Sequence, residues 1–393
     1  MPEPSGSNGK EEIVVIGAGI IGVCTAYYLT QHPNFDPNKH HITLLEARRP
    51  AGGASGKAGG LLALWAFPQQ IVPLSFNLHK ELADKYGGEE EWGYRRVNTM
   101  SVEGDLTPQG PRKSLDTASL PESLDWIRTE LLTDWNSLGG PGTTAQVHPY
   151  KFTNFLLKKA QESKALDFII GSVTRIFSSA ENGPDYVGGL EYVSGDRAPV
   201  RINASKVVLA AGPWTSKLLP ECPISGLRAH SITIAPTRQV SAHALFTELR
   251  LSRHKLVSPE IYPRKDEVYV CGEGDTAVPV PESTDDVEVV REKCDDLFKY
   301  AAKVSPELEG GRLLRRQACY LPVVDVPSCS GPFMGETNIN GLFLASGHSC
   351  WGINNAPGTG KVMAELVLEG KARSARLTGL EPAAFFDVQL DEE

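Results

Sequence analysis

The sequence predicts an α/β protein in which a domain with a parallel sheet is joined to a second domain of mostly antiparallel strands. The apolar run 13–16, which leads directly into the glycine-rich turn 17–22, and the continuous apolar strand within 206–214 are typical of a parallel sheet covered on both faces. The alternating stretches 227–236 and 267–272 predict the antiparallel strands. A chain of 393 residues is long enough for both domains.

The first strand turns on glycines into a helix that continues through 23–29. Gly17 permits the tight turn, Gly19 lets a diphosphate approach the backbone, and Gly22 lets the helix pack closely on the strand. Free N–H groups and the positive end of the helix dipole favour an anion at this turn. The turn therefore predicts a dinucleotide site.

The second strand, 42–45, ends at Glu46, whose carboxylate is placed to accept hydrogen bonds from both hydroxyls of an adenosine ribose. Glu46 lies farther along the chain than the usual ~20 residues, because 32–41 forms a polar insertion between helix and strand. A second glycine-rich segment, 52–60, follows the acid. A cofactor that contains adenosine diphosphate is expected.

The sequence changes character after residue 60, with a helix expected around 74–86 and polar, irregular chain as far as 142. We interpret this part as an insertion into the nucleotide fold. That fold resumes with a helix at 150–161 and a strand at 168–176.

The last expected elements are an amphipathic helix at 287–304, a strand at 341–348 and a helix at 357–368. They complete a division into two discontinuous domains. The expected cofactor domain comprises 11–63, 145–215 and 306–385, the substrate domain comprises 64–144 and 216–305, and the flexible termini are 1–10 and 386–393.

Composition and charge exclude several classes of function. The formal net charge of −9 disfavours nucleic acid and anionic membranes as partners. No apolar run is long enough to span a bilayer and 1–10 lack the features of a secretory signal, so an intracellular, cytoplasmic protein is expected. The seven cysteines form no CxxC pair and no Cys/His cluster, which argues against a disulfide framework and against a metal site.

Five segments, in order along nearly the whole chain, resemble FAD-dependent oxidoreductases of the D-amino-acid oxidase, glycine oxidase and sarcosine oxidase superfamily. The similarity is greatest to its fungal amino-acid oxidase branch. The segments are 14–22, 45–62, 171–176, 207–214 and 341–360. The resemblance implies a Rossmann-like FAD-binding domain of the glutathione-reductase type and a substrate domain of mostly antiparallel strands.

The resemblance also assigns residues to the cofactor. The assigned residues would contact the pyrophosphate, the adenosine, the diphosphate linker and the flavin ring. Some of them would form a loop that closes over the phosphates. The set is Gly17, Gly19, Ile20, Ile21, Gly22, Glu46, Ala47, Arg48, Ala54, Ser55, Gly56, Lys57, Gly60, Leu61, Val173, Ala211, Gly212, Trp214, Gly347, His348, Gly352, Ile353 and Asn354. N–H groups of 352–354 at a helix start would stabilise the negative charge of a reduced flavin.

The activity implied by the resemblance is oxidation of a small amine or amino acid to an imine by hydride transfer to flavin N5, with O2 as acceptor and H2O2 as product. One alternative is a flavoprotein dehydrogenase that uses another acceptor. Another is an FAD-binding protein with a mainly binding or trafficking role. An NAD-dependent dehydrogenase is a further alternative, because Glu46 and the glycine turn serve either dinucleotide. The second glycine-rich segment and the Gly-His pair 347–348 favour FAD.

The substrate side departs from the family pattern. The arginine of the family's Gly-x-Arg-Pro segment is replaced by Leu321, and Trp351 stands nearest the position of the sarcosine-oxidase lysine. A carboxylate substrate would still need a cation or several N–H donors. The candidate cations are Lys57, Arg228, Arg264, Arg315 and Arg316.

The catalytic residues themselves are not identified by the sequence. The candidates are His348, Tyr262, Arg264, Trp351 and Tyr320. Cys319 aligns with the cysteine that attaches to flavin in sarcosine-oxidase-like members. FAD is expected to bind without a covalent bond, with Cys319 as the residue that would form one.

Overall fold

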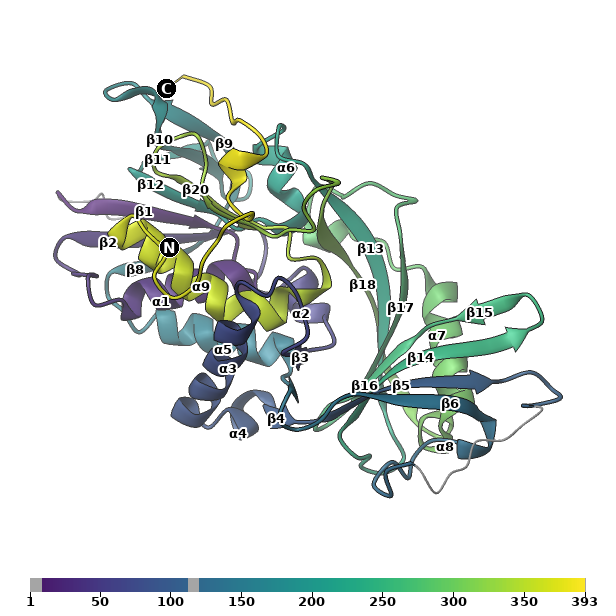
Figure 1. The fold of residues 1–393 in the computed structure, drawn as a ribbon. Helices are drawn as coiled ribbons and strands as arrows, with labels where there is room; N and C mark the ends of the chain where they lie inside the picture. Colours follow the sequence, from purple (N-terminus) through teal and green to yellow (C-terminus); the bar gives the residue numbers. More distant parts are fainter. Residues whose placement is uncertain (1–8, 112–119, 393) are drawn as a thin grey trace.

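The computed structural model describes residues 9–111 and 120–392, so 1–8, part of the terminus expected to be flexible, lie outside the described residues. A six-stranded sheet forms the centre of one domain, shown on the left of Figure 1. Its strands are, in order, β19 (Phe333–Glu336), β20 (Leu342–Ser346), β12 (Lys206–Leu209), β1 (Glu11–Ile16), β2 (His40–Glu46) and β8 (Leu166–Ile170). All neighbours are parallel except β19 and β20.

Different layers cover the two faces of this sheet. Ile13 and Val15 belong to one apolar cluster with the helices, whereas Val14 and Ile16 belong to another with a small antiparallel sheet. This alternation follows from the period of two along a strand. The helices are α1 (Ile20–Gln31), α5 (Pro149–Ala160) and α9 (Gly352–Glu369), with α3 (Val72–Tyr86) and α4 (Gly88–Trp92) beyond them, and the small sheet contains β9 (Ser172–Ser179), β10 (Gly183–Val193) and β11 (Val200–Asn203).

The second domain is built on an eight-stranded, mostly antiparallel sheet, and the long strands β13 and β18 run from one domain toward the other (Figure 1). The pair β14–β5 is parallel. The strands are β18 (Arg312–Val324), β13 (Ile224–Ala235), β17 (Val268–Asp275), β16 (Glu260–Pro263), β14 (His243–Ser252), β5 (Asn98–Asp105) and β6 (Leu132–Gly139), with β15 (Lys255–Val257) on β14. Helices α7 (Arg291–Val304) and α8 (Pro306–Glu309) share its main apolar cluster.

Short elements connect the domains. The second glycine-rich segment forms α2 (Ala54–Lys57) and then β3 (Leu61–Ala63), which joins β7 (Thr144–Gln146) and β4 (Arg95–Arg96) in a three-stranded sheet. The remaining short elements are α6 (Thr215–Leu218) and the 3₁₀ turns η2 (Thr129–Leu131), η3 (Gly212–Trp214), η4 (Thr284–Asp286), η5 (Ser349–Trp351) and η6 (Pro382–Ala384).

The predicted fold class is confirmed, and the observed elements refine the expected ones. The strand expected at 168–176 is two strands, β8 and β9, and the last helix begins at Gly352 instead of residue 357. The domain boundaries remain a prediction, with one amendment suggested by strand pairing. Because β18 pairs with β13 in the antiparallel sheet, we propose that the cofactor domain resumes after residue 324 and not at 306.

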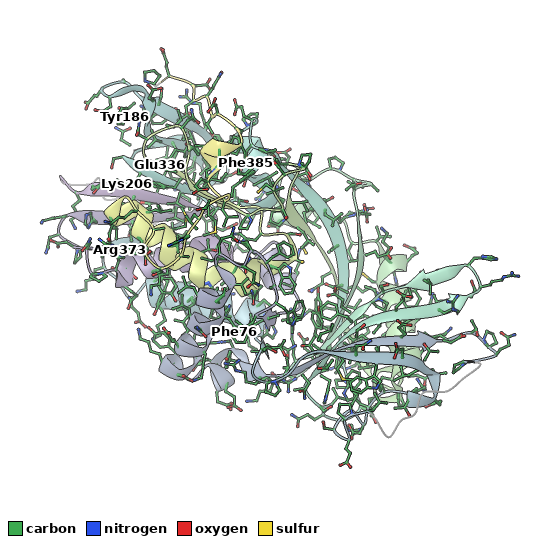
Figure 2. All side chains as sticks on the ribbon, viewed as in Figure 1. Phe76, Tyr186, Lys206, Glu336, Arg373 and Phe385 are labelled. Carbon is green, nitrogen blue, oxygen red and sulfur yellow. The ribbon has the colours of Figure 1, made fainter. Side chains whose placement is uncertain are left out.

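The C-terminal segment, which was expected to be flexible from residue 386, packs against the cofactor domain. Phe385, labelled in Figure 2, lies with its ring 5.4 Å from that of Phe333. Val388 is buried, and the Asp391 carbonyl accepts a hydrogen bond of 2.9 Å from the Ser178 N–H. Among the described residues, no helix is both long and apolar enough to cross a membrane.

Candidate functional site

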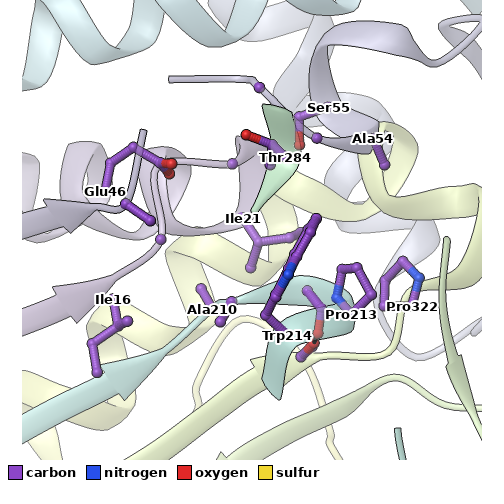
Figure 3. A pocket seen from close by; sticks show the side chains of 18 of the residues that line it. Ile16, Ile21, Glu46, Ala54, Ser55, Ala210, Pro213, Trp214, Thr284 and Pro322 are labelled. Atoms are coloured by element: carbon purple, nitrogen blue, oxygen red, sulfur yellow. Dashed lines mark hydrogen bonds between the residues drawn. The ribbon is translucent and has the colours of Figure 1, made fainter. Parts of the chain in front are cut away.

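A cavity of about 440 Å³ lies at the carboxyl ends of the parallel strands. Ile16, Glu46, Ala210 and Ser346 line it where β1, β2, β12 and β20 end or have just ended. This edge is where open α/β sheets bind their ligands. Figure 3 shows Glu46 on one side of the view and Pro322 on the other, so the cavity is lined by both domains.

The glycine turn at the start of α1 permits close approach to the cavity. Gly17 has φ +101°, and a Cβ there would stand 2.6 Å from the Ala210 carbonyl oxygen. A Cβ on Gly22 would lie 1.9 Å from the Gly17 carbonyl oxygen, which confirms the close helix–strand packing predicted for it. Gly19 lines the cavity, and the next N–H, of Ile20, donates to the Ser55 Oγ at 2.9 Å. The two glycine-rich segments therefore meet at this turn.

Glu46 stands at the end of β2, with its carboxylate against the same turn. It accepts hydrogen bonds from the N–H groups of Ala18 at 2.9 Å and Arg48 at 3.0 Å. Burial raises the pKa of Glu46, and these N–H groups oppose that rise. Val173, on β9, lines the cavity as well. The arrangement provides a fixed acceptor where an adenosine ribose was expected.

The other helix terminus at the cavity is the start of α9. Gly352 and Ile353 line the cavity, so the N-termini of α1 and α9 both face it. Two contacts with other segments hold this turn in place. Asn354 Oδ1 accepts a hydrogen bond from the Ala63 N–H at 2.9 Å, and His79 Nε2 lies 2.8 Å from the Ile353 carbonyl oxygen. Two dipole ends in one cavity favour a ligand with negative charge at two places.

His348 is a buried polar side chain with nothing to bind among the described residues. Both of its ring nitrogens lack a hydrogen-bond partner, although the side chain lines the cavity. Burial lowers its pKa to about 3, so the imidazole is neutral near pH 7 and offers one donor and one acceptor. An unpaired buried imidazole is costly unless a bound group completes its hydrogen bonds.

Most cofactor residues predicted from the sequence lie together. The cavity is lined by Gly17, Gly19, Ile20, Ile21, Glu46, Ala47, Ala54, Ser55, Val173, Ala211, Gly212, Trp214, His348, Gly352 and Ile353. Outside its lining are Gly22, Arg48, Gly56, Lys57, Gly60, Leu61, Gly347 and Asn354. The role of each in holding FAD remains a proposal.

Sequence reasoning missed the part of the lining that comes from the second domain. Glu282 and Ser283 reach the cavity from the loop before η4, Thr284 reaches it from the first position of η4, and Leu321 and Pro322 reach it from β18. No local pattern marks 282–284, whereas Leu321 is marked as the residue that replaces the arginine of the family's Gly-x-Arg-Pro segment.

The candidate catalytic residues other than His348 lie outside the cavity lining. Arg264 is buried and donates to the carbonyl oxygens of Ala58 and Gly59 and to Glu267. Tyr320 donates to the Val278 and Pro279 carbonyls, both at 3.0 Å. The structure therefore gives both residues partners within the protein.

Tyr262 and Trp351 lie on either side of a group of aromatic rings next to the cavity. Tyr262 donates to Glu260 and contacts Phe246, with 5.8 Å between ring centroids. Trp351 contacts Trp65 edge-to-face at 5.4 Å.

The candidate cations are mostly engaged by the protein. Arg228 forms ion pairs with Asp275 and Glu288, and Arg316 pairs with Asp295. Arg315 is exposed on β18. Lys57 donates to the Ala318 carbonyl at 2.8 Å, and burial lowers its pKa.

FAD fits this set of residues. Gly17 and Gly19 line the cavity without a Cβ and leave room for a diphosphate, Glu46 supplies an acceptor for the ribose, and His348 has two unsatisfied nitrogens. The lining reaches from the end of β2 to the start of α9, which suits an extended dinucleotide. Among the described residues, no group of three or more His, Cys, Asp or Glu side chains could hold a metal ion.

Comparisons with known proteins agree with this geometry. A family model described as "FAD dependent oxidoreductase" (DAO) matches residues 12–366. "Putative oxidoreductase TDA3" of Saccharomyces cerevisiae is 45% identical over 505 aligned positions, covering 98% of this chain and 96% of that protein. C1F5.03c of Schizosaccharomyces pombe, described in the same words, is 36% identical over 389 positions, covering 95% and 98%. The glycine oxidase structure from Geobacillus kaustophilus has a TM-score of 0.72 at 19% identity, covering 95% and 98%, and shows the fold.

Replacing Gly19 with Ala tests the close approach at the turn. The backbone at Gly19 is extended and a Cβ would meet only the Ser55 Oγ, at 3.2 Å, so the fold should be kept. We expect the FAD dissociation constant to rise at least about tenfold, because the methyl group occupies space that the diphosphate needs. Flavin fluorescence titration of apoprotein measures it. Gly142→Ala, at a glycine with no atom near its Cβ position, should bind FAD like the wild type.

His79 predicts a pH dependence of stability. Burial lowers its pKa to about 4 in the folded protein, against about 6.5 unfolded. The unfolded chain therefore takes up the proton first, and stability falls as the pH drops from about 6.5 to about 4, by up to about 1.4 kcal/mol per pH unit for this group. In urea unfolding at pH 7, 6 and 5, His79→Gln should lose less stability over this range. Equal losses in both proteins would contradict the assignment.

Proposed function

The chain belongs to the FAD dependent oxidoreductase (DAO) family, and we propose that within it this protein oxidises a small amine or amino acid with dioxygen as acceptor. Bound FAD would supply the two-electron redox chemistry that converts the amine to an imine, with O2 as the final electron acceptor and H2O2 as the product. The observation that supports this proposal is the single cavity that joins both glycine-rich segments, Glu46 and the start of α9.

The residues of the chain would bind, orient and shield in this reaction. The Ile20 and Ile21 end of α1 would hold the diphosphate, with Ser55 closing over it. The N–H groups at Gly352 and Ile353 would stabilise negative charge at the start of α9. His348, neutral near pH 7, would donate and accept hydrogen bonds without adding a charge.

The antiparallel sheet would close the site from the other side. The rings of Tyr262 and Tyr269 lie so close to Gly59 that a Cβ there would stand 2.3 Å from Tyr262 and 3.0 Å from Tyr269. Arg264 holds the Ala58 and Gly59 carbonyls against this wall. A wall of packed rings excludes water, which strengthens electrostatic interactions inside the site.

The oxidase proposal predicts that a purified, yellow holoprotein releases peroxide with at least one amine. The expected result is bleaching of the flavin absorbance by that amine without oxygen, and one H2O2 per amine oxidised when air is admitted. Bleaching by an amine with no reoxidation in air would instead support the dehydrogenase alternative. No bleaching across a panel of amines and amino acids would support a binding or trafficking role.

Non-covalent FAD is predicted from the state of Cys319. Burial raises the pKa of its thiol to about 11, although the charge of Lys57 opposes the rise, so the reactive thiolate is scarce near pH 7. Acid precipitation of the holoprotein should leave the flavin in the supernatant. Cys319→Ser should retain the same FAD content as the wild type, whereas yellow colour in the wild-type pellet that Cys319→Ser lacks would show a covalent bond.

A further inference from the structure

The face of the antiparallel sheet that meets the cofactor domain carries a carboxylate near its centre. Glu260 on β16 is paired with Cys271 on β17 and with Phe246 on β14, so the three side chains share one face. Tyr262, two residues along β16, points the same way and belongs to one apolar cluster with Leu61 of the second glycine-rich segment. Glu260 therefore faces the cofactor domain.

Glu260 has few hydrogen-bond partners for a half-buried carboxylate. It accepts from the Tyr262 hydroxyl and from the Cys271 Sγ at 3.6 Å. No lysine, arginine or histidine in the described part of the chain forms an ion pair with it. Burial raises the pKa of this carboxyl. The residue as a whole is nevertheless only half-buried. A cation is the partner that would offset the cost of its desolvation.

Aromatic rings stand beside the carboxylate. Phe246, the strand neighbour of Glu260, lies 6.0 Å from the ring of Trp65, which in turn lies 5.4 Å from that of Trp351. Trp65 keeps 40% of its surface exposed, and Phe67, 6.2 Å from Trp351, keeps 41%. The faces of such rings attract ammonium groups, most strongly where water is partly excluded.

This group adjoins the cofactor cavity. Cys350 lines the cavity at an exposed position, and its thiol pKa is raised by partial desolvation and secondarily by the negative charge of Glu260, so the carboxylate lies within electrostatic range of the lining. Trp351 follows Cys350 directly and precedes the first residue of α9. A molecule between Glu260 and the start of α9 would therefore lie where a substrate must meet the cofactor.

Resting on the proposed function, we propose that Glu260 and the rings of Trp65, Phe246 and Trp351 recognise the substrate as an ammonium ion, so that the substrate is an amine without a carboxylate next to its nitrogen. An amino acid would bring its own carboxylate toward Glu260, and like charges repel. Arg264, the buried arginine that follows the strand of Glu260, already binds two backbone carbonyls and Glu267, so its hydrogen bonds are not directed at a substrate carboxylate.

Binding of inert probes tests the proposal without turnover. Benzyltrimethylammonium and phenylacetate, of similar size and opposite charge, are titrated into the oxidised holoprotein at equal ionic strength while the flavin spectrum is recorded. We expect saturable binding of the cation only. Glu260→Gln should weaken it at least about tenfold. Glu248→Gln, which makes the same change at an exposed site on β14, should leave it unchanged.

Two results would overturn the proposal, namely phenylacetate binding at least as tightly as the cation, or unchanged cation binding in Glu260→Gln. If Glu260→Gln loses FAD, the proposal is judged by whether the wild type prefers the cation to phenylacetate. Glu260→Asp, which keeps the charge, should show the same preference.

Substrate panels separate this inference from the proposed function. Amino-acid amides should bleach the flavin anaerobically at lower concentration than the free amino acids. Equal bleaching by free amino acids, undiminished in Glu260→Gln, would overturn ammonium recognition and keep amine oxidation. Cation binding that depends on Glu260, without bleaching by any amine, would overturn the oxidation and keep the recognition site.

Discussion

The contact between α1 and α9 is the constraint on which the rest of the structure depends. At their crossing, a Cβ on Gly360 would stand 2.5 Å from the backbone carbonyl carbon of Cys24, so the two helices approach more closely than any larger residue at 360 would permit. This approach brings together the N-termini of two helices from opposite ends of the chain. Both termini then line one cavity, and their dipoles act on the same ligand.

The position of the antiparallel sheet depends on a second interaction, made by a buried arginine. Arg264 follows β16 and binds the carbonyls of Ala58 and Gly59, while Glu267 balances its charge at 2.7 Å. A paired, fully bonded guanidinium can be buried at acceptable cost, whereas removal of one partner leaves the others unsatisfied. Arg264, one of the candidate cations for a substrate carboxylate, thus holds the segment between the two domains.

The cofactor half of the site could be predicted from the sequence because its signals are local. The strand 13–16, its glycine turn and Glu46 are near neighbours in the chain, and each carries its own pattern. The proposed ammonium site could not be predicted, because only strand pairing places Glu260 on one face with Cys271 and Phe246. For the same reason the sequence offers no sign of the pairing between β18, which lies within the expected cofactor segment 306–385, and β13, which lies far away in sequence.

The two halves of the site also differ in polarity, and this difference limits what each can bind. The cofactor half presents N–H groups and helix termini, which suit a diphosphate. The half formed by the sheet would present Glu260 and aromatic rings, and His348, which is buried and lines the cavity, is uncharged near pH 7. With no positive side chain free beside Glu260 in the part of the chain that the structure describes, the local potential depends on whether that carboxyl is ionised. An ammonium ligand would favour the ionised form, so the wall and its ligand would stabilise each other's charge.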